Sequence, residues 1–174
     1  GSRWQKIESG TELPIQDIWG AKDDETGGDY ILCPASDKYH TSDKKLLNIT
    51  PNKTVTEIFW PFSNRDPYSV WFKCKKEIYV CGGGVLKRKV NGEYVIFNEL
   101  PSIFMNNIRG NDINDIFVTG DFGLFAHYNG VNWWVHPNSF YGTFLSVEVK
   151  GNTIVAVGEQ NAGSEALIIV LTRY

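Results

Sequence analysis

Three carboxylates stand beside turn-forming residues at corresponding places along the chain. Asp66 precedes a proline, and Asp121 and Glu159 each follow a glycine. Hydrolysis of a glycosidic bond needs two such groups, one to protonate the leaving oxygen and one to act as base or nucleophile. Loop carboxylates are also ordinary solvated residues. Glycoside hydrolysis is therefore the alternative hypothesis, and we assign no residue a catalytic role.

Histidines and cysteines do not form the pattern of a metal site. His127 and His136 flank an expected Asn129-Gly130 turn, but they are not opposite one another in that hairpin and no third ligand accompanies them. Three cysteines lack a Cys-x-x-Cys spacing, and we expect them to be small buried apolar residues: Cys33, Cys74 and Cys81. The sequence predicts neither a bound metal nor a cofactor.

The composition limits the classes of partner. The 174 residues carry a net charge of -3, and lysine and arginine are scattered along them. A nucleic-acid-binding protein would carry a basic stripe, so nucleic acid is not an expected partner. No run reaches the roughly twenty apolar residues of a membrane span. An aromatic content of 14% together with seventeen glycines favours β-structure.

A short apolar segment recurs along the chain. Its three strongest copies end in Gly82, Gly120 and Gly158, which are spaced 38 residues apart. A fixed period in this range is typical of stacked supersecondary units. The four copies, the first of them the weakest, are "DYILCP" (29–34), "EIYVCG" (77–82), "DIFVTG" (115–120) and "TIVAVG" (153–158).

Further strand patterns flank each copy, which predicts four antiparallel strands per unit. The strands that precede the copies share one aligned apolar column: Ile18, Val70, Ile108 and Val147. A third strand follows every copy, and a fourth follows in three of the units. For the last unit, residues 3–9 ("RWQKIES") have the matching pattern, with Trp4 in the place of Trp133.

This organisation predicts an all-β fold, a β-propeller of about four four-stranded blades in a single domain. The expected blade units are 14–60, 66–99, 104–137 and 143–174, the last of them closed by residues 3–9. Closure would remove exposed sheet edges. The alternatives are half of a larger propeller, an open arc, or a homodimer in which two chains complete one ring.

A column of small polar residues lies next to the apolar column on the innermost strands. Its members are Asp17, Ser69, Asn107 and Ser146. Short polar side chains at such positions can bond backbone groups of the adjacent blade, where close packing leaves no room for bulk. We favour this structural role over contact with a ligand in the central channel.

With the strands aligned, the units resemble a bacterial propeller repeat of the form DIWG, variable loop, DIxAVGxxGxxxHYNGxxW. The segments that carry the resemblance are "QDIWG" (16–20), "NDIFVTGDFGLFAHYNGVNWW" (114–134) and "SVEVKGNTIVAVG" (146–158). The family consists of secreted or lipid-anchored β-propeller proteins, some of them named glucosyl transferases or hydrolases, and this chain is similar to its C-terminal half. The resemblance implies an extracytoplasmic location (periplasmic, outer-membrane lipoprotein or secreted) but no mechanism.

In a propeller, ligands bind over the central channel, on the face formed by the second-to-third-strand loops and the blade connectors. Aromatic rings beside polar groups on that face suit a peptide or a sugar. We therefore expect a non-enzymatic binding or scaffold module for a protein, peptide or carbohydrate, with a carbohydrate-active enzyme as the alternative. The candidate ligand-binding residues are Tyr39, His40, Phe62, Arg65, Asp66, Asp121, Glu159, Phe140 and Tyr141.

Overall fold

The computed structural model describes residues 3–23, 26–37, 43–137, 141–160 and 165–173, and every sheet in it is antiparallel. Blade 1 contains β1 (Trp19–Lys22), β2 (Asp29–Ala35), β3 (Lys45–Ile49) and β4 (Val55–Ile58). Blade 2 contains β5 (Pro67–Trp71), β6 (Glu77–Gly82), β7 (Gly84–Lys89) and β8 (Tyr94–Ile96).

Blades 3 and 4 follow the same plan. Blade 3 contains β9 (Met105–Asp112), β10 (Asp115–Gly120), β11 (Phe125–Tyr128) and β12 (Trp133–Val135). A short 3-10 turn, η1 (Asp121–Gly123), joins β10 to β11. The described part of blade 4 contains β13 (Thr143–Lys150), β14 (Thr153–Gln160) and β15 (Glu165–Thr172). In each sheet the strands pair in chain order, which confirms the all-β prediction.

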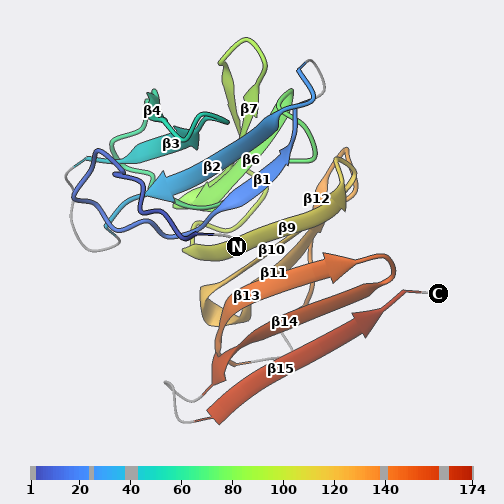
Figure 1. Ribbon diagram of the computed structural model, residues 1–174. Helices are drawn as coiled ribbons and strands as arrows, with labels where there is room; N and C mark the ends of the chain where they lie inside the picture. Colours follow the sequence, from blue (N-terminus) through green and yellow to red (C-terminus); the bar gives the residue numbers. More distant parts are fainter. Residues whose placement is uncertain (1–2, 24–25, 38–42, 138–140, 161–164, 174) are drawn as a thin grey trace.

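The blades form an open arc in chain order, with blade 1 at one end and blade 4 at the other (Figure 1). The innermost strand of each blade contacts that of the next, β1 with β5, β5 with β9 and β9 with β13. Among the described residues, no helix has the length and hydrophobicity of a membrane span.

Apolar clusters fill the three junctions between consecutive blades. Side chains of a strand alternate between its two faces, so each inner blade presents one apolar face to each neighbour. The junction of blades 1 and 2 buries Leu32, Leu46, Val70, Val80 and Leu86. The junction of blades 2 and 3 buries Trp71, Tyr79, Ile108, Ile116 and Val118. The junction of blades 3 and 4 buries Phe117, Phe125, Phe144, Val147 and Ala156.

The recurring glycines mark the place where the first strand of a blade bulges against the second. Gly120 pairs with Met105, and Gly158 pairs with Phe144, each next to a one-residue shift in register. A Cβ atom on Gly120 would collide with the carbonyl oxygen of Phe104, and one on Gly158 with that of Thr143. The glycines therefore recur at this position because the bulge leaves no room there for a side chain.

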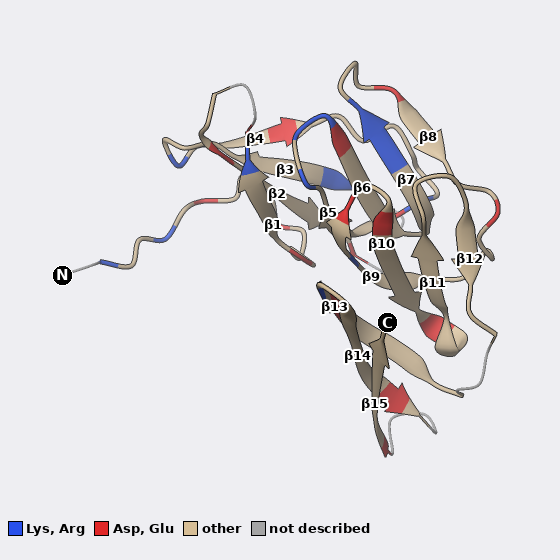
Figure 2. Ribbon diagram, turned by 90° about the vertical axis from the view of Figure 1, so that its right-hand side faces the viewer, with Lys and Arg blue, Asp and Glu red and all other residues tan. Residues whose placement is uncertain are grey.

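The structure corrects the expectation that residues 3–9 close the last blade of the same molecule. These residues form no strand, and the Lys53 ammonium, beside the outer strand of blade 1, donates a hydrogen bond to Gln5 Oε1 at 2.9 Å. Blade 4 lies at the other end of the arc, away from the N-terminal segment (Figure 2). Its last described strand, β15, pairs with β14 alone. The single chain thus forms an arc, as one of the alternatives expected.

Candidate functional site

At the junction of blades 1 and 2, two candidate residues bind other parts of the protein. Arg65 donates a hydrogen bond from Nη1 to the Gly83 carbonyl, at 2.7 Å, across the turn between β6 and β7. The Asp66 carboxylate forms an ion pair with Lys44 at 2.9 Å, and both side chains are largely buried. Partly buried pairs are screened by salt less than exposed ones. Arg65 and Asp66 therefore fix the blade connector in place.

Phe62, from the same connector, covers the core between these two blades. Its ring packs edge-on against Trp60 and Tyr94, with ring centroids 5.5 and 5.4 Å apart. Edge-to-face packing of this kind is a favoured geometry for aromatic side chains. Phe62 therefore contributes to the blade core, which leaves less of its ring for a ligand.

At the junction of blades 3 and 4, the turn η1 presents Phe122 to solvent. Phe122 has φ 55°, in the left-handed region, and its side chain is 72% exposed. Several bonds hold the turn: the Asp121 N–H donates to the Phe104 carbonyl at 3.0 Å, and Asn106 Nδ2 donates to Asp121 Oδ1 at 3.0 Å. A non-glycine residue in this conformation costs about 1–2 kcal/mol. The surrounding structure fixes this strained turn.

Two further candidate residues lie at the same junction. The Gly123 N–H donates to the Gly142 carbonyl at 2.6 Å, which ties η1 to the connector between blades 3 and 4. Tyr141, next to Gly142, is 90% exposed. Glu159 is also exposed and pairs with Thr143 on the neighbouring strand. Asp121, Phe122 and Tyr141 are therefore carried by two loops that bond one another, and Glu159 lies beside them near the end of β14.

The structure thus separates the candidate residues. Asp121, Glu159 and Tyr141 gather at the junction of blades 3 and 4, with Phe122 added to them, whereas Phe62, Arg65 and Asp66 belong to the junction of blades 1 and 2. Tyr39, His40 and Phe140 lie outside the described residues. Phe122 follows Gly120-Asp121 in the expected loop between the second and third strands, which is the sequence signal that places it beside Asp121.

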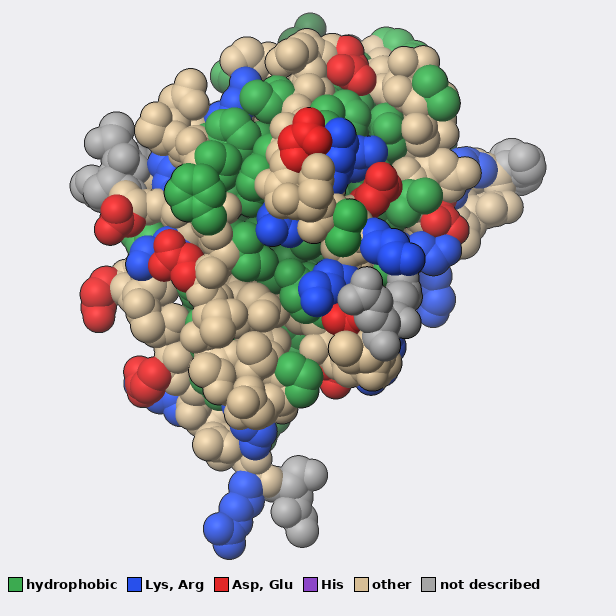
Figure 3. Space-filling view, turned by 90° about the horizontal axis from the view of Figure 1, so that it is seen from above, with side chains coloured by type: hydrophobic (Ala, Val, Ile, Leu, Met, Phe, Trp, Pro, Cys, Tyr) green, Lys and Arg blue, Asp and Glu red, His purple; other side chains and the backbone are tan. Residues whose placement is uncertain are grey.

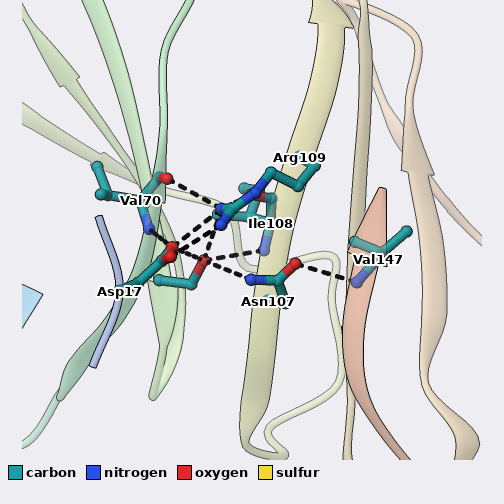
Figure 4. Close-up of polar contacts among 7 residues, drawn as sticks. Asp17, Val70, Asn107, Ile108, Arg109 and Val147 are labelled. Carbon is teal, nitrogen blue, oxygen red and sulfur yellow. Dashed lines mark hydrogen bonds and ion pairs between the residues drawn. The ribbon is translucent and has the colours of Figure 1, made fainter. Parts of the chain in front are cut away.

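The column of small polar residues forms a relay from blade to blade (Figure 4). Asp17 Oδ2 accepts a hydrogen bond from the Val70 N–H at 3.2 Å, and Ser69 Oγ accepts one from the Ile108 N–H at 3.2 Å. Asn107 Oδ1 accepts one from the Val147 N–H at 3.0 Å. Each side chain thus satisfies a backbone amide of the following blade that would otherwise be buried without a partner.

Arg109 ties this relay together and could not be assigned from the sequence. Its guanidinium donates to Asp17 from Nη1 at 2.9 Å and from Nη2 at 2.8 Å, and it also donates to Ser69 Oγ at 3.2 Å. About one eighth of each charged side chain is exposed (12% for Arg109 and 13% for Asp17). Bidentate pairs between arginine and a carboxylate are strong and geometrically specific. Arg109 therefore links blade 3 to blade 1 across blade 2.

A second buried polar group lies at the outer part of the blade 3–blade 4 junction. Asp115 accepts hydrogen bonds from Arg173 Nη1 (2.5 Å), Asn111 Nδ2 (2.7 Å) and His127 Nε2 (2.9 Å). Burial opposes ionisation of Asp115, but the hydrogen bonds outweigh it and hold the pKa of Asp115 below its ordinary value. The His127 ring also stacks on Phe117, 4.3 Å away. His127 is therefore a structural residue of this junction.

All three cysteines are free thiols, of which Cys33 and Cys81 are buried and Cys74 is half-buried. Burial raises the pKa of Cys33 to about 11 and also raises the pKa of Cys81. In the part of the chain that the structure describes, His, Cys, Asp and Glu side chains do not gather in groups of three or more suited to a metal ion.

Acidic and basic side chains are interspersed with hydrophobic ones on the face seen in Figure 3.

No protein family matches the sequence, and no curated protein matches it. A solved structure described as "YCF48 bound to D1 peptide" is similar, with a TM-score of 0.68 and 12% sequence identity. The match covers all of this chain and 55% of that chain. This likeness, together with the four consecutive sheets, confirms the β-propeller fold. The chain spans just over half of the length of the propeller it matches.

Proposed function

We propose that this protein is a non-enzymatic binding module that takes an extended peptide segment on the loops at the junction of blades 3 and 4. Phe122 carries the proposal, because its ring is exposed on a turn that holds a strained backbone conformation. Glycine would adopt φ 55° without that strain. Strained residues of this kind concentrate at functional sites.

The surroundings of Phe122 favour a peptide with an apolar side chain next to a basic one. Phe122 and Tyr141 offer aromatic area for the apolar group, since their loops are joined by the bond from Gly123 to Gly142. Asp121 and Glu159 supply negative charge at the same junction. Aromatic residues are enriched at interface hot spots. The similar propeller described as bound to a peptide supports this class of ligand.

The test is a selection from a random peptide library displayed on phage, with the immobilised protein as bait. We expect enriched peptides to bind wild type with micromolar affinity in fluorescence polarisation, and Phe122→Ala and Tyr141→Ala each to weaken binding at least tenfold. Trp134→Ala is the matched control, because Trp134 is an exposed aromatic residue on the outer strand β12. Equal binding by all four proteins would refute the assignment.

Two further measurements test the backbone strain at Phe122 and the possibility of glycoside hydrolysis separately from peptide binding. Phe122→Gly should be about 1 kcal/mol more stable than Phe122→Ala in urea, because only glycine adopts the left-handed conformation without strain. Release of nitrophenol from a panel of nitrophenyl glycosides, lost in a variant with Asp121→Asn and Glu159→Gln, would instead establish the carbohydrate-active alternative.

A further inference from the structure

We propose that two copies of this chain join end to end into one ring, in which residues 3–9 of each copy form the fourth strand of the partner's blade 4. The proposal is independent of the peptide-binding function. It rests on three features of the arc: the outer face of blade 4, the face of blade 1 that is turned away from blade 2, and the N-terminal segment.

The outer face of blade 4 has the composition of a blade junction. Ser146, Val157 and Ile168 form one row across its three strands, and Val155 and Val170 are paired in the next row. Ile168 is 68% exposed and Val170 61%. The corresponding row of blade 2 is fully buried against blade 3: Ser69, Cys81 and Val85. A contiguous exposed apolar face of this kind marks an interaction surface.

The face of blade 1 that is turned away from blade 2 is the complementary half of such a junction, although its centre is already covered: Cys33 and Leu47 are buried there, with Leu13 packed against them. Ile18 is 57% exposed, although its counterparts at the three filled junctions are buried: Val70, Ile108 and Val147. Those three residues donate their N–H groups to the polar residue of the preceding blade. In the dimer, the Ile18 N–H of one copy would therefore donate a hydrogen bond to the Ser146 hydroxyl of the other copy. This bond would add a fourth link to the relay.

Residues 3–9 have the spacing of a fourth strand that leads into the next blade. Tyr94 and Trp133 begin the fourth strands of blades 2 and 3, and Met105 and Phe144 occupy the bulge of the following blade. Ile15 is at that bulge position in blade 1, where it bridges to Ala35. The same interval of eleven residues separates three pairs: Trp4 and Ile15, Tyr94 and Met105, Trp133 and Phe144.

Blade 4 has a free edge and an apolar pocket where that strand would lie. The eight-residue strand β15 pairs only with β14 among the described strands. A pocket of about 270 Å³ beside it is lined by Phe125, His136, Pro137 and residues 169–171. Trp133 packs against Phe97 and Tyr128, with ring centroids 5.9 and 5.2 Å apart. The position of Phe97 in blade 2 corresponds to His136 in blade 3, and the position of Tyr128 in blade 3 corresponds to Leu171 in blade 4. Both of these residues line the pocket, so Trp4 of the partner would fill it.

A second copy is the occupant that fits all three features at once. One chain carries both complementary faces, but they lie at opposite ends of its arc (Figure 1), so it cannot bring them together itself. Exchange of an identical element between protomers is a common way to form a dimer. Trp4, which is fully exposed in the single chain, then becomes buried.

Light scattering after size-exclusion chromatography tests the assembly. We expect twice the mass of one chain (19.7 kDa) for wild type, and at least a tenfold weaker dimer for Trp4→Ala and for Ser146→Arg. Val131→Arg, an exposed site on the turn between β11 and β12, should leave the dimer intact. Trp4 and Ser146 are exposed in the single chain, so both variants should keep the circular dichroism of wild type. A monomer, a ladder of larger species, or a dimer that both variants leave unchanged would overturn the proposal.

A spin label tests the strand exchange itself. The label is attached to Lys6→Cys, an exposed site in the same segment, in a Cys74→Ser background, since the two remaining thiols, Cys33 and Cys81, are buried. This chain is mixed with ¹⁵N-labelled wild type. Broadening of the wild-type amides of His136 and Leu171 is the expected result. Unchanged wild-type amides would exclude the exchange, because the label would then lie only beside Lys53 and Thr54 of its own chain, which carries no ¹⁵N.

Discussion

The junction between blades 3 and 4 and the outer face of blade 4 use the same repeat positions with opposite results. At the junction, Asn107 accepts the Val147 N–H and both residues are buried. One blade further on, Ser146 holds the position of Asn107 but is exposed. The same repeat position therefore contributes differently to the stability of different blades, because its contribution depends on whether another blade packs against it.

The largest effect in this comparison should come from Arg109, at the centre of the filled junctions. Arg109→Leu leaves the Asp17 carboxylate, only 13% exposed, without its cation. Breaking a buried pair in this way costs about 3–5 kcal/mol. Urea unfolding followed by circular dichroism measures the loss. The control is Lys73→Leu, which breaks the exposed pair with Asp112 and should cost at most about 1 kcal/mol; equal losses would contradict the role of burial.

Asp115 should give the next largest effect and a characteristic dependence on pH. Asp115→Asn weakens its hydrogen bonds to Arg173 and His127, and hydrogen bonds to charged groups contribute about 1.5–3 kcal/mol. The folded state lowers the pKa of Asp115, so the stabilisation is present above its ordinary pKa of about 3.9 and is lost as pH falls through the folded value. The difference between wild type and variant should therefore be constant from about pH 5 to 7, which lies about one unit or more above that pKa, and should shrink below about pH 4.

A difference that persists unchanged at pH 3 would show that Asp115 does not act through its charge. Urea midpoints across this range, measured at one ionic strength, provide the comparison. Asp29→Asn is a suitable control, because Asp29 pairs with Lys22 in an exposed position.

The smallest effects compare the two ends of the relay directly. Asn107→Ala leaves the buried Val147 N–H without a partner, which costs about 1–2 kcal/mol. Ser146→Ala changes an exposed residue and should fall within about 0.5 kcal/mol of wild type in the monomer. Thermal or urea unfolding at low protein concentration tests this pair. A large loss for Ser146→Ala under these conditions would mean that the relay residues stabilise their own blades.

The fold could be predicted from the sequence because its repeat is physically demanding. Gly82, Gly120 and Gly158 recur where a Cβ atom would collide with the backbone of the first strand, so the period remains visible. The apolar column from Ile18 to Val147 marks one face of every blade. The closure by residues 3–9 could not be settled this way, because a strand pattern specifies a place in a blade but not the molecule to which that blade belongs.

The candidate site was predicted less completely. The predicted loop positions of Asp121, Tyr141 and Glu159 do meet at one junction, but the sequence did not reveal that Asp66 is paired with Lys44. It also could not reveal the left-handed conformation of Phe122, since a phenylalanine carries no signal for positive φ. Arg109 escaped notice because its counterparts in the other blades, Trp71 and Glu148, share no chemistry with it.

The relay also gives the stack of blades a polarity. At every filled junction the side-chain oxygen belongs to the earlier blade and the amide to the later one. Two blade 4 faces set against each other would bring hydroxyl to hydroxyl and leave no amide between them. Like the subunits of a polar filament, these blades can be added in one direction only, whether the next blade comes from the same polypeptide or from another.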